Sequence, residues 1–122
     1  MSVAENKQLV HRYFDERWNH KNYEVIDELL DPSLGIEETK ADLAATHAAF
    51  SDIKLTMDHL IGEGDEVVVP WEVTGTHQGD YRGIAASGNP ITFQGLALLR
   101  LAEGKIVSDV AFGNDLDVLL NK

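Results

Sequence analysis

The chain contains no cysteine among its 122 residues. This absence excludes a disulfide scaffold, a thiolate zinc site and a cysteine nucleophile. Five histidines are present, but no pair of them stands with a carboxylate at a spacing typical of metal ligands. We therefore expect no metal site.

Positive charge is also scarce, because 10 Lys and Arg residues stand against 21 Asp and Glu residues, for a formal net charge of −11. Such a chain repels phosphate backbones and anionic lipid, which argues against a nucleic-acid partner or a membrane-surface role. The apolar runs fall far short of the roughly 18 residues that a membrane helix needs. The segment MSVAENKQLV lacks the pattern of a secretory signal. A soluble cytoplasmic protein is expected.

Internal repeats, low-complexity segments and linkers are all absent from the sequence. The hydrophobic fraction of 43% is ordinary for a globular chain. A chain of this length buries a real core and has room to enclose a small ligand. We predict one domain over residues 1–122.

The first half of the chain has helical periodicity. Ser2 and Glu5 are spaced as a capping box for a first helix. Asn22 is expected to cap a second helix, which Asp31-Pro32 ends, and a third is expected from about Glu37. Four-residue spacing gives the first helix a stripe that faces a core, formed by Val10, Phe14 and Trp18.

The second half changes to the period of β-strands. Residues 53–61 alternate between apolar and polar side chains, which predicts a half-buried strand and places His59 on its buried face. Three longer strands are expected over 66–77, 89–102 and 105–112, followed by a short helix over 115–120. Helices followed by hairpin-linked strands predict an α+β domain, with the helices packed on one face of an antiparallel sheet.

Residues 5–120 resemble the SnoaL-like polyketide cyclases, most specifically over 64–107. The matching features are Ala49-Phe50-x-Asp52, Gly64-Asp65, Trp71, Gly75-Thr76-His77-x-Gly79, Gly83, Ser87-Gly88, Arg100 and Gly104-Lys105-Ile106-Val107. The resemblance implies the fold of nuclear transport factor two and ketosteroid isomerase, in which N-terminal helices pack on a curved antiparallel sheet that forms a cone with an internal pocket. It also implies a homodimer through the sheet. The glycine-rich stretch 73–95 would then bend a long hairpin at the mouth of the cone.

The family resemblance further implies acid/base chemistry without a metal or an organic cofactor, carried by an acidic residue just after the last strand. Counting back from Leu119-Leu120 points to Asp115, whereas the strand register points to Asn114. Asp109 is the second candidate for the catalytic carboxyl group. A carboxylate in a dry cavity has its charged form disfavoured, which brings its pKa toward the range of a general acid or base. Asp115 is equally suited to cap the final helix.

The expected ligand is a small hydrophobic carbonyl compound. The reaction classes left open are cyclisation, isomerisation and hydration, and a non-catalytic binding or dimerisation module of the same fold is the alternative. Epoxide hydrolases of this fold need an Asp-Arg-Asp arrangement, which Arg100 and Asp109 match only loosely. Each candidate for substrate binding can also be read as a core or surface residue. These candidates are Tyr13, Trp18, Trp71, His77, Phe93, Gln94, Phe112 and Asn114.

Overall fold

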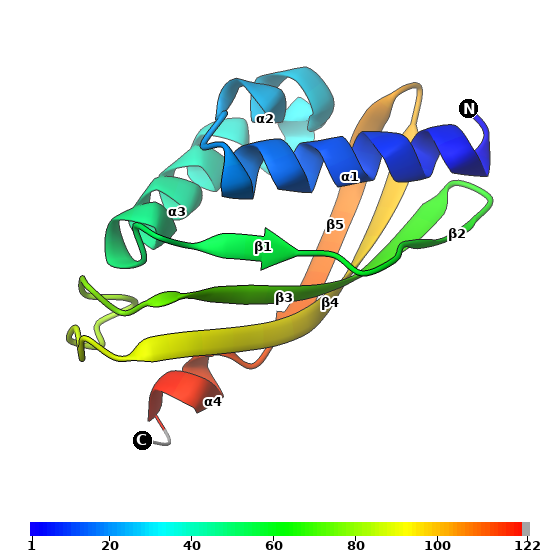
Figure 1. The fold of residues 1–122 in the computed structure, drawn as a ribbon. Helices are drawn as coiled ribbons and strands as arrows, with labels where there is room; N and C mark the ends of the chain where they lie inside the picture. Colours follow the sequence, from blue (N-terminus) through cyan, green and yellow to red (C-terminus); the bar gives the residue numbers. More distant parts are fainter. Residues whose placement is uncertain (121–122) are drawn as a thin grey trace.

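The structure, a computed structural model, describes residues 1–120 (Figure 1). The helices α1 (Val3–Asn19), α2 (Glu24–Leu29) and α3 (Ile36–Ala49) come first, with a 3-10 turn, η1 (Pro32–Leu34), between the last two. The strands are β1 (Lys54–Thr56), β2 (Ile61–Glu63), β3 (Glu66–Thr76), β4 (Pro90–Ala102) and β5 (Lys105–Gly113), and α4 (Asp115–Leu120) follows them. This order confirms the α+β prediction. None of the described helices is both long and apolar enough to cross a membrane.

The N-terminal helix begins as its sequence predicts. The Glu5 amide donates to Ser2 Oγ at 3.1 Å and the Ser2 amide donates to Glu5 Oε1 at 2.9 Å, which completes the capping box. The predicted cap of the second helix is wrong. Tyr23 occupies the N-cap position of α2, while the Asn22 side chain donates to Glu16 Oε1 at 2.7 Å.

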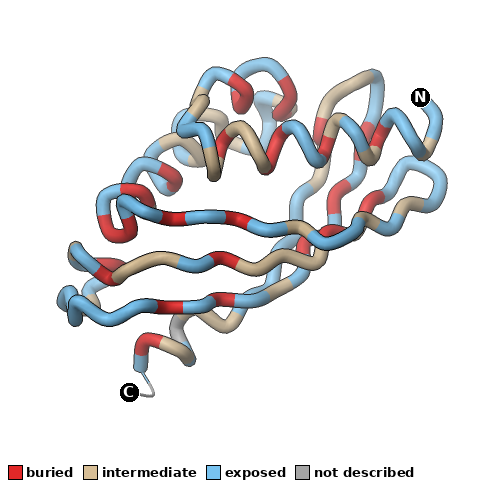
Figure 2. The backbone as a smooth tube through the Cα atoms, in the orientation of Figure 1, coloured by how far each residue is buried: buried red, intermediate tan, exposed pale blue. Residues whose placement is uncertain are grey.

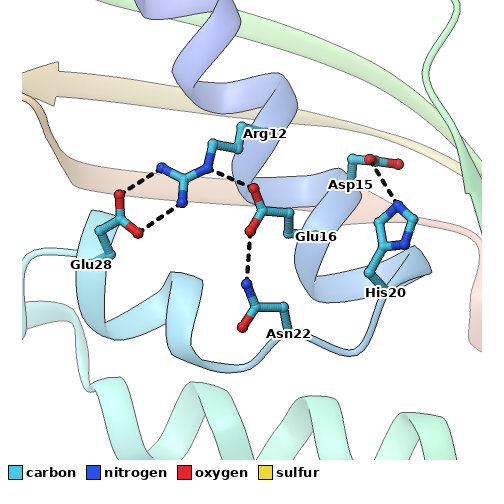
Figure 3. A network of polar contacts seen from close by, with 6 residues as sticks. All are labelled: Arg12, Asp15, Glu16, His20, Asn22 and Glu28. Atoms are coloured by element: carbon cyan, nitrogen blue, oxygen red, sulfur yellow. Dashed lines mark hydrogen bonds and ion pairs between the residues drawn. The ribbon is translucent and has the colours of Figure 1, made fainter.

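Exposed charged groups link α1 to α2 beside that contact (Figure 3). The Arg12 guanidinium donates to Glu16 at 2.6 Å and to both carboxylate oxygens of Glu28 at 2.6 and 2.8 Å. Asp15 faces His20 at 3.3 Å. Ion pairs of this exposed kind contribute little to stability, so the packing of the helices on the sheet sets their position.

The sheet is antiparallel throughout, in the order β1-β3-β4-β5, with β2 also paired to β3. The two long strands β3 and β4 form its centre, in register from Glu66 opposite Arg100 to Thr76 opposite Pro90. Figure 1 shows the sheet curving beneath α1, with the helices α1 to α3 on one side of it. This arrangement is the predicted curved sheet covered by N-terminal helices.

The predicted single strand over 53–61 is wrong in one respect, because it is broken into two pieces. Thr56 pairs with Glu72, whereas Ile61 pairs with Val68, so four residues of one chain segment stand opposite three of the other. An odd residue of this kind moves the following side chains to the opposite face. As a result Leu55 is buried, but His59 is exposed, which overturns the prediction of a buried histidine.

The two faces of the sheet differ in their surroundings. Along β4, alternate residues Phe93, Ala97 and Leu99 are buried toward the helices, where the core lies (Figure 2). The side chains between them point outward, and no described helix of the α1–α3 layer covers them. The exposed large apolar residues of this outer face are Leu96, Leu98, Val110 and Phe112 on β4 and β5, together with Ile61 on β2.

Candidate active site

A cavity of about 460 Å³ lies between the helices and the inner face of the sheet. Most of its wall is aromatic or aliphatic, but four charged side chains also reach it. Two are carboxylates, Asp109 and Asp115, and two are arginines, Arg17 and Arg82. The remaining lining residues are Phe14, Trp18, Thr46, Ile53, Leu55, Trp71, Val73, Tyr81, Phe93, Ala97, Ala111, Phe112 and Gly113.

Asp109 reaches the cavity from β5, where it stands opposite Leu99. By accessible surface Asp109 is an exposed residue that opens onto the cavity, yet nearby protein atoms remove part of the water around its carboxyl group. This loss of hydration raises the pKa of Asp109, and the positive charge of Arg17 opposes the rise without cancelling it. A carboxyl group in such a setting is suited to exchange protons with a ligand.

Asp115 belongs to a second polar group, formed with the loop between β3 and β4. The Tyr81 hydroxyl donates to Asp115 Oδ2 at 3.0 Å, and the Arg82 guanidinium lies 5.3 Å from the centre of the Tyr81 ring. Burial, together with the negative charge of Asp115, raises the pKa of Tyr81, so its hydroxyl stays protonated as a donor. The sharp bend of this loop depends on Gly83, whose φ of 80° suits glycine.

The polar cavity residues that our sequence reasoning missed include Tyr81, Arg82 and Arg17. Arg17 is the more deeply buried of the two arginines. It is only 9% exposed, its Nη1 donates to Tyr13 Oη at 2.8 Å, and its guanidinium lies 5.0 Å from the Tyr13 ring centre. Its Nε has no hydrogen-bond partner among the described residues. A signal for it existed in the sequence. Val10, Phe14 and Arg17 follow helical spacing, so a charged residue occupies a position of the core-facing stripe.

Six of the ten predicted site residues do line the cavity. They are Asp109, Asp115, Trp18, Trp71, Phe93 and Phe112, although Phe112 only borders the cavity, because its side chain lies on the outer face opposite Leu96 and is 73% exposed. The Trp71 indole lies across a pair of glycines, Gly95 and Gly113, that face each other on β4 and β5. A Cβ on Gly95 would stand 2.3 Å from the indole, so these glycines provide the space that this wall of the cavity needs.

Tyr13 and His77 lie elsewhere than predicted. Tyr13 is completely buried and is not part of the cavity wall. Its hydroxyl oxygen accepts the hydrogen bond from Arg17 and so helps to hold that side chain in place. His77 was expected at the rim, but it is 0% exposed and its ring stacks on Phe50 at 5.3 Å. Its Nδ1 lies 3.5 Å from Ser87 Oγ. Its backbone closes the loop, because the His77 amide donates to the carbonyl oxygen of the residue preceding Pro90.

Gln94 and Asn114 are also away from the cavity lining. Gln94 is exposed on the outer face of β4, and its Nε2 donates to Glu72 Oε2 at 3.1 Å. Asn114 Oδ1 accepts from the backbone amide of Gln94 at 2.8 Å, which fixes the junction of β5 and α4. The geometry therefore places the carboxylate of Asp115, and not the amide of Asn114, at the cavity. Arg100 is likewise exposed on the outer face, so it forms no Asp-Arg-Asp arrangement with Asp109.

Within residues 1–120, no three His, Asp or Glu side chains gather as ligands of a metal ion would. The polar groups of the cavity are instead proton donors and acceptors held in an apolar surrounding. What the arrangement supports chemically is proton transfer and the stabilisation of charge on a bound molecule.

Comparisons with known proteins agree with this architecture. A protein from Jannaschia sp. CCS1, assigned to the SnoaL-like polyketide cyclases, is 27% identical, with a TM-score of 0.87 over 96% of this chain and 90% of that one. AclR from Streptomyces galilaeus, a hydroxylase candidate, is 25% identical, with a TM-score of 0.85 over 98% of this chain and 96% of AclR. TsrD from Streptomyces laurentii is 24% identical and shares the fold, with a TM-score of 0.88 over 98% of this chain and 97% of TsrD.

No curated protein matches the chain in sequence. The model of the SnoaL-like polyketide cyclase family, in contrast, matches residues 7–121, nearly the whole chain. The chain therefore belongs to the SnoaL-like polyketide cyclase family.

Proposed function

We propose that this protein is an acid/base enzyme that needs no cofactor and acts on a small hydrophobic carbonyl compound held in the cavity. Asp109 is the proton-transferring group of this proposal, and Asp115 is the second carboxylate. The observation that carries it is the setting of Asp109, which lines a cavity with a mostly aromatic or aliphatic wall, where loss of hydration raises the pKa of its carboxyl group. Family membership supports the same class of chemistry.

The proposed reaction begins with Asp109 removing a proton from the carbon next to the carbonyl group. The electron pair of the C–H bond moves into the carbonyl group, which becomes an enolate, and Asp109 carries the proton. Returning that proton to another carbon gives isomerisation. Attack of the enolate carbon on a second carbonyl group of the same molecule gives cyclisation, and the oxygen of that second carbonyl group then takes the proton from Asp109. A raised pKa makes the protonated form of this carboxyl group easier to form, so that one group can serve both proton steps.

Hydrogen–deuterium exchange tests the proposal without knowledge of the natural substrate. The probe is 2-tetralone, a bicyclic ketone of a size suited to the cavity, and the loss of its α-proton signals in D₂O is followed by NMR. We expect the wild-type protein to accelerate exchange and Asp109→Asn to lose about 10²-fold or more of that acceleration. Asp117→Asn, which removes an exposed carboxylate from α4, is the matched control and keeps the wild-type rate.

The other outcomes separate the alternatives. Loss of exchange in Asp115→Asn but not in Asp109→Asn would move the catalytic role to Asp115. A wild-type protein that binds 2-tetralone and other cyclic ketones and enones, yet accelerates no exchange, would support the non-catalytic binding module. Either result contradicts the role proposed for Asp109.

The same proposal includes the assembly and organisation of the chain. The exposed apolar face of the sheet supports a homodimer through the sheet, formed by Leu96, Leu98, Val110 and Phe112. One buried cluster joins residues of the helices and of the sheet, which supports a single domain. The cytoplasmic location expected from the sequence stays a prediction.

A further inference from the structure

We propose that Arg17 forms an anion-binding subsite within the cavity, so that the ligand of this protein carries an anionic oxygen, either a carboxylate or an enolate, on its hydrophobic body. The inference deepens the proposed function, because it concerns the same cavity and therefore rests on that cavity being a ligand site. It does not require catalysis by Asp109. Binding measurements consequently test it separately from turnover.

The first observation is a buried cation whose charge is not balanced. Arg17 is 9% exposed, and within residues 1–120 no carboxylate lies within ion-pair distance of it. Its one hydrogen-bond partner there is the neutral hydroxyl of Tyr13. A buried charge is costly unless it is paired, and an arginine is almost never buried without a partner for its charge. This arginine occurs in a chain with 21 acidic residues, none of which supplies the partner.

The second observation is the unused hydrogen-bonding capacity of the same side chain. A guanidinium carries five N–H donors in a planar fork that matches the two oxygens of a carboxylate. Nη1 uses one donor on Tyr13, while the buried Nε has no partner within the described chain. Nε is enclosed by protein atoms, so a bound oxygen acceptor would meet the guanidinium at Nη2, which no described residue engages and which is not enclosed.

The third observation is that Arg17 is held in place and reaches the cavity. Its guanidinium lies 5.0, 5.9 and 5.8 Å from the ring centres of Tyr13, Phe14 and Trp18. Aromatic faces attract a cation and restrict its motion, but they leave its net charge in place. Phe14, Trp18 and Arg17 all line the cavity. The aromatic groups therefore form an apolar wall, and the guanidinium places a positive charge within it.

Asp109 is the internal group that competes for this role. Its charge and that of Arg17 attract each other, but the two groups are not within ion-pair distance, and loss of hydration disfavours the ionised carboxylate. Asp109 therefore does not neutralise Arg17 as a direct ion pair would. A ligand oxygen in the cavity makes the contact that Asp109 does not make. Charge-assisted hydrogen bonds of this type are about twice as strong as neutral ones.

Calorimetric titration with matched pairs of probes tests the subsite at neutral pH. The carboxylate arm compares 2-naphthoate with 2-naphthamide, which has a similar shape but no charge. The enolate arm compares dimedone, which is ionised at this pH, with its neutral O-methyl enol ether. We expect the wild-type protein to bind at least one of the two anions at least tenfold more tightly than its neutral counterpart. The arm that shows this preference identifies the class of anion.

Substitutions assign the preference to a residue. Arg17→Met keeps a long apolar stem and is expected to reduce the preference to twofold or less, while Arg82→Met, at the other cavity arginine, is expected to keep it. Arg17→Lys keeps the charge but loses the planar fork, and we expect at least a threefold loss of the preference. This variant serves as the test if circular dichroism shows that Arg17→Met does not fold.

Three results would overturn the inference. They are a wild-type protein that shows no preference for either anion, an unchanged preference in the folded Arg17 variants, and a preference that is lost in Arg82→Met alone. Failure of the proposed function is distinguishable from these results. If Asp109 is not catalytic, the exchange of 2-tetralone protons fails, but the preference for anions and its loss in Arg17→Met remain.

Discussion

Asp109 combines a raised pKa with a position in the cavity wall, which links function to stability at a single residue. Its folded-state pKa lies above the unfolded value of about 3.9, so the fold favours the protonated form. Ionising Asp109 in the folded protein therefore costs stability. This cost is absent below the pKa of Asp109 in the unfolded chain, grows as the pH rises toward its pKa in the folded protein, and is complete above that value. The charged form of this residue therefore lowers stability at neutral pH.

Replacing Asp109 with asparagine is expected to remove that cost. Asp109→Asn should match the wild-type protein at pH 3 and exceed its unfolding free energy at pH 7. The gain should be less than about 1 kcal/mol, because the carboxylate keeps some access to water. Urea denaturation across this pH range measures the difference. Asp117→Asn is the control, and a gain in Asp109→Asn that does not vary with pH would show that ionisation of the carboxyl group is not its cause.

At the residue scale, the sequence could identify which chemical groups were available but not where each side chain would point. Asp109 and Asp115 were predicted from the family resemblance, which implies an acidic residue on or just after the last strand, and both line the cavity. Gln94 was not, since the residues around it are apolar on both faces of β4 and leave its direction undetermined. Arg17 was missed because a charged residue on a helix is ordinarily solvated, and its buried position depends on three-dimensional packing.

At the scale of elements, the cavity wall depends on the close approach of β4 and β5 beneath the Trp71 side chain. Gly95→Ala would place a Cβ 2.0 Å from the Phe112 carbonyl oxygen and 2.3 Å from the indole, and neither can move without shifting the strand or the aromatic wall. We expect a loss of about 1–3 kcal/mol in unfolding free energy. Chemical denaturation measures it. Thr92→Ala, exposed on the same strand, should change stability by less than about 0.5 kcal/mol.

If the denaturation midpoint of Gly95→Ala equals that of the wild-type protein, the strands separate easily at this point. It would then follow that the glycine pair does not hold the indole against the cavity. Ligand binding by the same variant gives a second measurement, because a displaced Trp71 changes the shape of the site even where the fold survives.

The order and type of the elements were predictable, since the period changes from helical to alternating between the two halves of the chain. The break between β1 and β2 was not. Alternation describes one strand, whereas the break arises from pairing with β3, whose curvature brings Thr56 and Ile61 into different registers. The prediction that Asn22 caps α2 failed for a similar reason, because the Asn22 side chain makes a contact with Glu16 on the preceding helix.

At the scale of the whole molecule, the net charge of −11 contrasts with an apolar outer face on the sheet. The exposed side chains of this face lie on neighbouring strands, with Leu98 opposite Val110 and Leu96 opposite Phe112, which is 73% exposed. A contiguous apolar patch of this kind is typical of an interaction surface. Two copies related by a twofold axis would bury the same patch on each chain.

Leu98→Glu tests the proposed dimer at the centre of this patch. We expect the wild-type protein to have twice the chain mass of 13.5 kDa in light scattering at micromolar concentration, and the variant to have the mass of one chain. The reason is that a twofold interface would bury two added carboxylates close together, and two copies of a chain with a net charge of −11 already repel each other. Leu34→Glu makes the same change at an exposed leucine of η1, away from the sheet, and should remain dimeric. A monomeric wild-type protein, or a folded Leu98→Glu variant that stays dimeric, would show that this face is not the interface.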